Sequence, residues 1–187
     1  MDHYIDLRVR SDPEFPVPQL LNALFAKLHR ALVALKADDI GVSFPGHKSK
    51  GAGLGHTLRL HGHQARLQHL MQENWLTGMA DHIDAAGILP IPAGVQHRIV
   101  QRVQVHSSAE RIRRRQMKRH GLTAEEARQR IPDTVEQRLD LPWLTLRSQS
   151  TGQHFRLFVE HLPCQTTAVS GSFNAYGLSN VATVPWF

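Results

Sequence analysis

HYIDLRVR, residues 3–10, alternates between apolar and polar side chains, and this alternation predicts a half-buried β-strand. A proline-rich turn follows the strand, and Pro18 suits the first turn of a helix. The helix is expected to run to about Leu35, because leucine and alanine side chains recur along it at the spacing that forms one apolar stripe. The chain therefore opens with the first two elements of an α+β module.

Further strands and helices are predicted to complete this module, at Ile40–Phe44 and Thr57–His61 (strands) and at His63–Gln72 and Asn74–Ala86 (helices). The resulting β-α-β-β-α order is close to a ferredoxin-like (RRM-like) half-fold. A Pro/Gly stretch ends near Gly94, and we place the domain boundary there. Residues 1–94 are expected to form one domain, and residues 95–187 a second α+β domain.

The second domain has its own order of elements. A strand is predicted first, then a basic helix that ends at Gly121, then a helix that begins with the capping box Thr123-x-x-Glu126 and stops before Pro132. The expected strands and the short turn or helix are Arg98–Val105, Asp133–Leu139 (turn or helix), Trp143–Arg147, His154–His161 and Ser172–Tyr176. The fold class predicted for the whole chain is therefore α+β.

The basic helix, SSAERIRRRQMKRH at residues 107–120, carries six Lys/Arg among the nine residues from Arg111 to Arg119. Ser107-x-x-Glu110 fits a capping box at its start, and no carboxylates follow the arginines at the i+4 position. A solvated helical face is the ordinary fate of such a charge run, but contact with a nucleic-acid backbone is favoured here. The side chains proposed to make this contact are Arg111, Arg114, Arg115, Lys118, Arg119 and His120.

The positive charge of the chain is concentrated around the basic helix. The 187 residues carry a net charge of +6, whereas residues 95–130 alone hold ten Lys/Arg and three Asp/Glu, a net charge of +7. The single cysteine, Cys164, excludes an intrachain disulfide and a Cys-based zinc finger. The first residues lack the apolar core of a signal peptide, and no uncharged apolar run approaches the ~20 residues that span a bilayer. A cytoplasmic protein with no membrane partner is expected.

Two polar residues beside the basic helix are candidates for reading bases. Arg102 and Gln104 share one face of the predicted strand, and their side chains fit guanine and adenine edges, each through two hydrogen bonds. The plainer alternative is a pair of solvated residues on an exposed strand face.

Further candidates lie on the first helix and on a polar loop between two strands. His29 lies at the edge of the apolar stripe, which leaves it half-buried with a ring nitrogen available. The chain has thirteen histidines, and any single histidine more often has a structural role than a catalytic one. Ser148, Ser150 and Thr151 could hydrogen-bond phosphate or ribose, or simply form a hairpin turn. Phe155 could stack on a terminal base, or belong to the core. His61-Gly-His63 lacks further metal-ligating partners, so no metal site is expected.

Together these segments closely resemble the type I-F CRISPR repeat-specific endoribonucleases, which process precursor CRISPR RNA. The similarity covers essentially the whole chain and is strongest at both ends and over residues 101–160. The stretches that carry it are MDHYIDLRVR (1–10), DPEFP (12–16), LFAKLH (24–29), QRVQ (101–104), HSSAERIRRRQMKRH (106–120), EEARQRIPDTVEQRLDLPWLTLRSQSTGQHFRLFVEH (125–161), YGLSN (176–180) and VPWF (184–187).

The resemblance implies a ferredoxin-like N-terminal domain and an RNA-binding C-terminal domain whose arginine-rich helix enters the major groove of the repeat's stem-loop. By the same resemblance, His29 and Ser148 form the catalytic pair, and Tyr176 is an aromatic residue that helps to position the histidine. Arg102 and Gln104 would read bases near the bottom of the stem, Phe155 would stack below the terminal base pair, and Ser150 and Thr151 would hold the scissile phosphate.

The implied reaction is cleavage by the RNA's own 2′-OH at the base of the stem, which gives a 5′-hydroxyl and a 2′,3′-cyclic phosphate. It needs neither a metal nor another cofactor, and His29 could serve as base, acid or both. The expected partners are the CRISPR repeat RNA hairpin, which stays bound as crRNA, and other subunits of the type I-F crRNA-guided surveillance complex. Two alternatives stay open: a hairpin-binding subunit that does not cleave, and a DNA-binding regulator.

Overall fold

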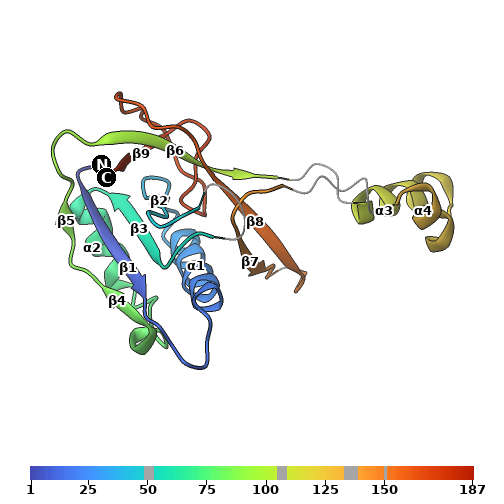
Figure 1. The fold of residues 1–187 in the computed structure, drawn as a ribbon, viewed down its shortest axis with the longest axis horizontal. Coiled ribbons are helices and arrows are strands. Elements are labelled where there is room, and N and C mark those ends of the chain that lie inside the picture. Colours follow the sequence, from blue (N-terminus) through green and yellow to red (C-terminus); the bar gives the residue numbers. More distant parts are fainter. Residues whose placement is uncertain (49–52, 105–108, 133–138, 150) are drawn as a thin grey trace. The chain divides into compact units, whose positions relative to one another are not determined.

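The computed structural model describes residues 1–48, 53–104, 109–132, 139–149 and 151–187 (Figure 1). These residues form two compact units, Met1–Val103 with Leu141–Phe187, and Gln104–Asp140. The elements, in chain order, are β1 (His3–Val9), α1 (Val17–Ala34), β2 (Gly41–Ser43), β3 (Thr57–Gly62), α2 (Gln64–Gln72), the 3-10 helix η1 (Ala80–His82), β4 (Ile83–Ala85), β5 (Leu89–Pro90), β6 (Gln96–Val103), α3 (Ala109–His120), α4 (Ala124–Arg130), β7 (Trp143–Arg147), β8 (His154–His161) and β9 (Thr183–Trp186). The predicted α+β class is confirmed.

The first sheet of the larger unit has the strand order β2-β3-β1-β4, and β5 also pairs with β1. Neighbouring strands in it are antiparallel, with Ile5 opposite Leu60 and Leu7 opposite Leu58. The apolar side chains of β1 are buried while Arg8 is exposed, so the alternation in residues 3–10 predicted this half-buried strand correctly. Both α1 and α2 contact β1, so the apolar faces of the two helices cover the sheet.

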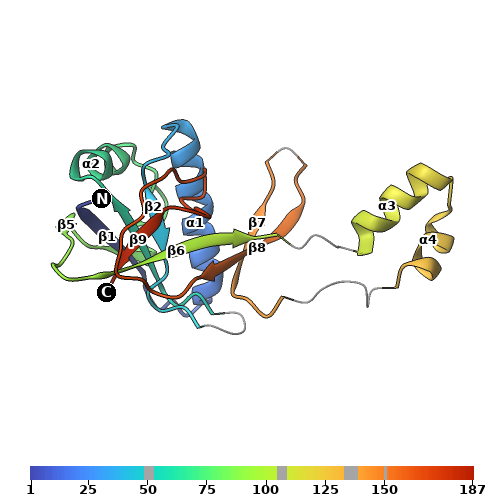
Figure 2. The same ribbon diagram turned by 90° about the horizontal axis from the view of Figure 1, so that it is seen from above.

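The second sheet has the order β7-β8-β6-β9 and is also antiparallel. β7 and β8 form a hairpin that packs beside α1 (Figure 2). Leu144, Leu146 and Leu157 are buried in the same apolar cluster as the core of the first sheet. The two sheets therefore share one core, and the hairpin is held against the helix that carries His29.

Glycine is required where β2 meets β9. A Cβ atom on Gly41 would lie 2.6 Å from Cγ1 of Val184 and 2.9 Å from the ring of Phe173, closer than real Cβ contacts come. We infer that glycine at position 41 lets the last strand of the second sheet lie against the edge of the first.

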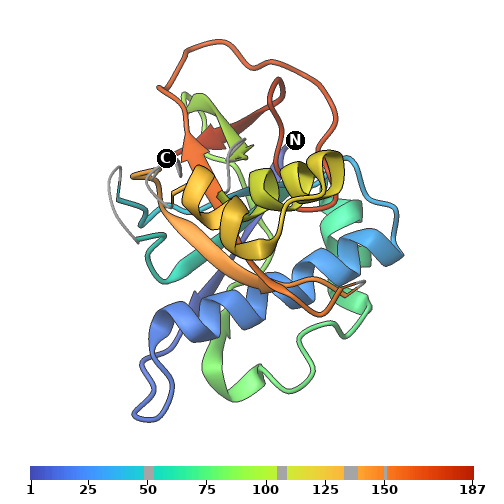
Figure 3. The same cartoon turned by 90° about the vertical axis from the view of Figure 1, so that its right-hand side faces the viewer.

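The smaller unit contains the helices α3 and α4, drawn in yellow to gold in Figure 3. Ala109 and Ala127 are buried, and Ile112 and Met117 are partly buried, so the apolar side of α3 packs within this unit. The capping box at Thr123 and Glu126 is confirmed, and the Thr123 backbone N–H lowers the pKa of the Glu126 carboxyl. Arg113 donates from Nε to the Ile131 carbonyl at 2.8 Å, which ties the end of α4 to α3.

Two predicted elements are wrong. Residues 74–86 form turns, η1 and β4 instead of a helix, because Asn74 (φ 49°) and Gly78 (φ 76°) adopt left-handed conformations that interrupt a helix. Residues 172–174 have no regular secondary structure and residues 175–176 lie in a turn, so the strand expected at 172–176 is absent. The last strand of the sheet is β9, which was not predicted. The other predicted strands and helices are confirmed to within about two residues of their bounds, where the structure describes them.

Some predictions lie outside the described residues: the capping serine Ser107, Val105 at the end of the predicted strand, and residues 133–138 of the predicted turn or helix. The domain boundary near Gly94 stays a prediction about how the chain is divided. Within the part of the chain that the structure describes, no helix has both the length and the apolar character needed to cross a membrane.

Candidate active site

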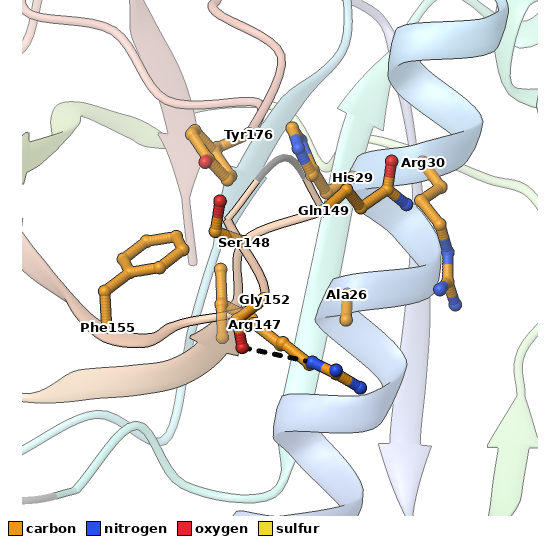
Figure 4. A pocket seen from close by; sticks show the side chains of 10 residues that line it. Ala26, His29, Arg30, Arg147, Ser148, Gln149, Gly152, Phe155 and Tyr176 are labelled. Atoms are coloured by element: carbon orange, nitrogen blue, oxygen red, sulfur yellow. Dashed lines mark hydrogen bonds between the residues drawn. The ribbon is translucent and has the colours of Figure 1, made fainter.

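A cavity of about 640 Å³ opens in the larger unit where α1, the β7–β8 hairpin and the turn before Gly177 meet (Figure 4). Three segments that are distant in sequence supply its polar side chains. Its lining includes His29 and Arg30 from α1, Arg147, Ser148 and Gln149 from the hairpin, Phe155 from β8, and Tyr176 from the turn. The residues predicted as the catalytic pair, His29 and Ser148, thus line the same space.

His29 is partly buried on α1, beside the apolar stripe that packs into the core. Its Nδ1 lies 2.8 Å from the backbone carbonyl oxygen of Ala175. A carbonyl oxygen can only accept, so Nδ1 must carry the hydrogen of this bond. The neutral ring therefore has its lone pair on Nε2, the atom that can take up a proton.

Tyr176 holds the plane of the histidine ring. The two rings are stacked, with centroids 4.2 Å apart and an interplanar angle of 14°. The Phe25 ring is also parallel to the Tyr176 ring, with centroids 6.3 Å apart. His29 is therefore restrained both in its plane, by the stack, and at one nitrogen, by the hydrogen bond.

The turn that carries Ala175 and Tyr176 is fixed to the sheet below it. The Asn174 side chain accepts from the Tyr176 backbone N–H at 2.9 Å, and the Val42 N–H of β2 donates to the Gly177 carbonyl at 2.8 Å. Gly177 has φ 69°, and an added Cβ would collide with the Val42 side chain. We infer that glycine here allows the close approach that sets the position of Tyr176 over His29.

Ser148 is the first residue after β7 and begins the hairpin turn. Its backbone N–H donates to the Gln153 carbonyl at 2.9 Å, and its carbonyl accepts from the Gly152 N–H at 2.9 Å. The Thr151 N–H donates to the Ser148 hydroxyl oxygen at 3.3 Å. Gly152 has φ 68°, and the hairpin turn predicted for this loop is confirmed. Ser150 lies outside the described residues. The hairpin thus fixes the backbone from which the Ser148 hydroxyl projects.

Phe155 and Arg102 lie close together beside the cavity. The Arg102 guanidinium carbon is 5.8 Å from the Phe155 ring centre and 5.5 Å from the Tyr176 ring centre. Both side chains are partly buried, and Phe155 packs against the core while it also lines the cavity. Gln104, the other predicted base reader, is exposed just beyond the end of β6. The Arg102 guanidinium therefore lies close to two aromatic rings beside the cavity.

The cationic residues of α3 are described within their own unit. Arg114, Arg115, Lys118, Arg119 and His120 are exposed, and the side chain of Arg111 lies outside the described residues. Arg113 is partly buried, and its guanidinium donates to the Ile131 carbonyl within the unit. Such a set of cations on one short helix can bind a polyanion.

Two other histidines of the larger unit, His61 and His161, are packed in its interior. His61 is fully buried and pairs with the Ser43 hydroxyl at 2.8 Å, and burial lowers the pKa of His61 to about 3. His161 stacks on His47 with ring centres 3.8 Å apart, and burial lowers the pKa of His161 to about 2. His63 pairs with Asp2 instead of joining His61. Among the described residues, no three His, Cys, Asp or Glu side chains gather in a way that could hold a metal ion.

Sequence reasoning missed three residues of the cavity wall, Arg30, Arg147 and Gln149, and the Ala175 carbonyl that binds the His29 ring. Arg30 follows His29 directly, and Arg147 and Gln149 flank Ser148, so their adjacency to the predicted pair was the available signal. No sequence pattern marked the Ala175 carbonyl, because a backbone acceptor is the same at every residue.

Known proteins match the whole chain. A family model described as a CRISPR-associated protein (Cas_Csy4) matches residues 4–187. Similar proteins include the CRISPR-associated endonuclease Cas6/Csy4 of Pseudomonas aeruginosa (strain UCBPP-PA14), 54% identical over 187 residues, which is 100% of both chains. The CRISPR-associated endonuclease Cas6/Csy4 of Escherichia coli (strain UTI89 / UPEC) is 45% identical over 187 residues, again 100% of both chains.

Proposed function

This chain belongs to the Cas_Csy4 family of CRISPR-associated proteins, and on that basis we propose that it is an endoribonuclease of crRNA processing. It binds the stem-loop of the CRISPR repeat RNA, cleaves at the base of the stem, and stays bound to the mature crRNA. One observation carries the proposal most directly: a histidine with a defined tautomer and a serine hydroxyl line the same cavity.

We propose a ferredoxin-like architecture for the N-terminal part of the chain. The antiparallel strand order β2-β3-β1-β4, with α1 following β1 and α2 following β3, supports it. In this arrangement α1 carries His29, and the helix packs on the strands of the sheet, which hold the residue in a fixed position. Proton transfer needs such a fixed position, because small displacements of the reacting groups reduce the rate strongly.

The reaction proposed is attack by the RNA's own 2′-OH on the adjacent phosphorus. Nε2 of neutral His29 takes the proton from the 2′-OH, the bond from O2′ to phosphorus forms, and the bond from phosphorus to O5′ breaks. The departing oxygen takes up a proton, from the imidazolium or from water, so the products are a 2′,3′-cyclic phosphate and a 5′-hydroxyl. The Nδ1 bond to the Ala175 carbonyl supports this role, since it leaves the lone pair on Nε2.

Ser148 is assigned a positioning role at the ribose. A serine hydroxyl is too weak a base to deprotonate the 2′-OH, but it can hydrogen-bond the ribose and hold the 2′-oxygen in line with the phosphorus. The fixed backbone of the hairpin at Ser148 supports this assignment. Thr151 and Ser150 are assigned to the phosphate, and Tyr176 to orienting His29. No step of this reaction requires a metal ion.

Hairpin binding is assigned to α3 and to residues near the cavity. Arg111, Arg114, Arg115, Lys118, Arg119 and His120 would contact the stem in its major groove, which opens near the ends of an RNA helix. Arg102 and Gln104 would read bases at the bottom of the stem, and Phe155 would stack below the terminal pair. Many phosphate contacts release counterions and support retention of the product, on which other subunits of a crRNA-guided complex would assemble.

The test is cleavage of a transcript of the repeat by the wild-type protein and by His29→Ala, in EDTA, with analysis of the RNA ends. The wild type should cut once at the base of the stem and leave a 2′,3′-cyclic phosphate. His29→Ala should bind with similar affinity and cut at least about 100-fold more slowly. His69→Ala, which removes an exposed histidine on α2, is the matched control and should cut at the wild-type rate.

Other results would contradict this assignment. Cleavage by His29→Ala at the wild-type rate would remove the histidine from the mechanism. Binding of the hairpin without cleavage by the wild-type protein would favour a non-cleaving subunit, and preference for duplex DNA of the same sequence would favour a DNA-binding regulator. Cleavage only after magnesium is added would contradict metal independence.

A further inference from the structure

Two arginines on the wall of the cavity have no role in the mechanism above. Arg30 follows His29 on α1, and Arg147 is the last residue of β7, directly before Ser148. Both line the same cavity as the histidine and the serine (Figure 4). Each is therefore placed by the backbone that positions its catalytic neighbour.

The wall that these arginines share carries positive charge and no described negative charge. No Asp or Glu is among the residues that line the cavity, and no described carboxylate forms an ion pair with Arg30 or Arg147. The Arg147 Nε donates to the Gly152 carbonyl at 3.2 Å, which orients its guanidinium along the wall. Two guanidinium groups without a counter-charge favour an anion, and phosphate oxygens accept from guanidinium groups in charge-assisted bonds.

Position along the cavity indicates which phosphate they contact. Figure 4 shows Phe155 and Arg30 on opposite sides of the drawn group, with Ser148 and His29 between them. Ala26 lies four residues before Arg30 on the same helix face and also lines the cavity, and its small side chain keeps the wall beside Arg30 open. A strand that stacks at Phe155 and reacts at Ser148 would continue past Arg30.

We propose that Arg30 and Arg147 bind the phosphates of the RNA segment on the 3′ side of the cleaved bond. The inference rests on the proposed function, which places the end of the stem at Phe155 and the scissile phosphate between His29 and Ser148. Single-stranded RNA that leaves the hairpin is the ligand of this site. The enzyme therefore contacts the flank that it releases, and a substrate with a longer flank is cleaved more efficiently than one that ends a single nucleotide after the cleaved bond.

The experiment compares two RNAs with the same hairpin, one that ends a single nucleotide after the cleaved bond and one that continues for four more nucleotides. The measured quantity is the ratio of kcat/KM for the long RNA to that for the short RNA. For the wild type we expect a ratio of about 10, the factor that one charge-assisted contact of ordinary strength supplies. Arg30→Ala should bring the ratio to about 2 or less, whereas Arg30→Lys, which keeps the charge, should retain most of it.

Binding gives a second readout that does not depend on cleavage. In a His29→Ala background, the slope of log Kd against log salt for the long RNA should fall by about 0.7 when Arg30 is replaced by alanine, since one phosphate contact of a single strand is lost. Arg8→Ala, which removes an exposed arginine from β1, is the matched control. It should leave the long-to-short ratio of kcat/KM and the salt slope of log Kd unchanged from those of its parent protein. Arg147→Ala should lower the same ratio and slope.

The outcomes separate this inference from the function on which it rests. Failure of the wild type to cleave either RNA refutes the proposed function, and the inference with it. If the wild type cleaves both RNAs, but the long-to-short ratio and the salt slope are the same in Arg30→Ala as in its parent, the hairpin endonuclease stands and the flank site is refuted. A lower ratio in both Arg30→Ala and Arg8→Ala also refutes the site, because the effect would then follow net charge alone.

Discussion

His29 is held by two contacts of different kinds, a hydrogen bond from Nδ1 to the Ala175 carbonyl and a stack on the Tyr176 ring. The hydrogen bond selects the tautomer, and the stack restricts rotation of the ring. Neither contact uses the Tyr176 hydroxyl, since a ring face alone provides the stack. The role of Tyr176 can therefore be tested by separating its ring from its hydroxyl.

We predict that Tyr176→Phe cleaves the repeat hairpin at close to the wild-type rate and that Tyr176→Ala is slower by about 10-fold. Aromatic stacking of this kind contributes about 0.5–1.5 kcal/mol, which corresponds to a rate factor of this size if it is lost. Single-turnover cleavage gives the rate, and hairpin affinity should stay within about twofold for both variants. A phenylalanine variant as slow as the alanine variant would assign the effect to the hydroxyl and contradict positioning by the stack.

The composition of the site could be predicted only in part from the sequence. His29 and Ser148 are 119 positions apart, and no spacing rule brings together a helix and a hairpin at that separation. The resemblance to a known family supplied the pair, and the structure shows that both line one cavity. Arg30 and Arg147 carried no separate signal, because an isolated arginine at the protein surface is ordinary.

At the scale of elements, the sequence predicted correctly those helices and strands that neighbouring residues determine. The alternation in β1, the apolar stripe of α1 and the capping box of α4 each determine an element from neighbouring residues, and each was predicted correctly. The helix expected at 74–86 fails because Asn74 and Gly78 adopt positive φ, which composition alone did not reveal. β9 was missed because it contains Pro185, and its pairing with β6 is a long-range contact.

The strands β3 and β8 bury the two histidines whose pKa values are lowest, and this burial predicts a loss of stability in acid. Burial lowers the pKa of His61 to about 3 and that of His161 to about 2, whereas both take up a proton near pH 6.5 when unfolded. Below pH 6.5 the unfolded chain therefore binds protons that the folded chain does not, and the free energy of unfolding falls with pH. Between pH 7 and pH 5 each histidine contributes a loss of about 2 kcal/mol.

Urea unfolding at several pH values measures this slope. His161→Phe keeps an aromatic ring beside His47 and removes one titrating group. The free energy of unfolding of this variant should therefore fall between pH 7 and pH 5 by about half of the amount assigned to His61 and His161 together. The slope is the relevant quantity, because the variant also loses the bond from the Phe44 N–H to the His161 ring. A slope equal to that of the wild type would show that His161 is not the source.

The two kinds of arginine on α3 give a further prediction. Arg115 is exposed, whereas Arg113 donates to the Ile131 carbonyl, so equal changes of charge should have different effects. Arg115→Ala should weaken binding of the hairpin strongly and lower the salt slope of binding by about 0.7–0.9. Arg113→Ala should instead lower the thermal stability of the α3–α4 unit and change the salt slope less. Equal changes of slope would mean that binding follows net charge and not one face of the helix.

At the scale of the whole molecule, the two units have different tasks in the proposed function. The larger unit contains the cavity with His29 and Ser148, and the smaller unit presents the cations of α3. Binding and cleavage should therefore be separable, since contacts to the phosphates of the stem supply affinity while one ribose supplies the nucleophile. A reaction that uses this ribose distinguishes the proposed chemistry from attack by water.

The most direct measurement replaces the single ribose whose 2′-OH is proposed to attack by 2′-deoxyribose in an otherwise unchanged repeat hairpin. We predict that the protein binds this RNA with a Kd within about twofold of that for the normal RNA, because one hydroxyl among many contacts is lost. We also predict that no cleavage is detected over the time in which the normal RNA is fully cut. Cleavage of the substituted RNA at the same position would contradict the account, because another nucleophile would then have to replace the 2′-OH.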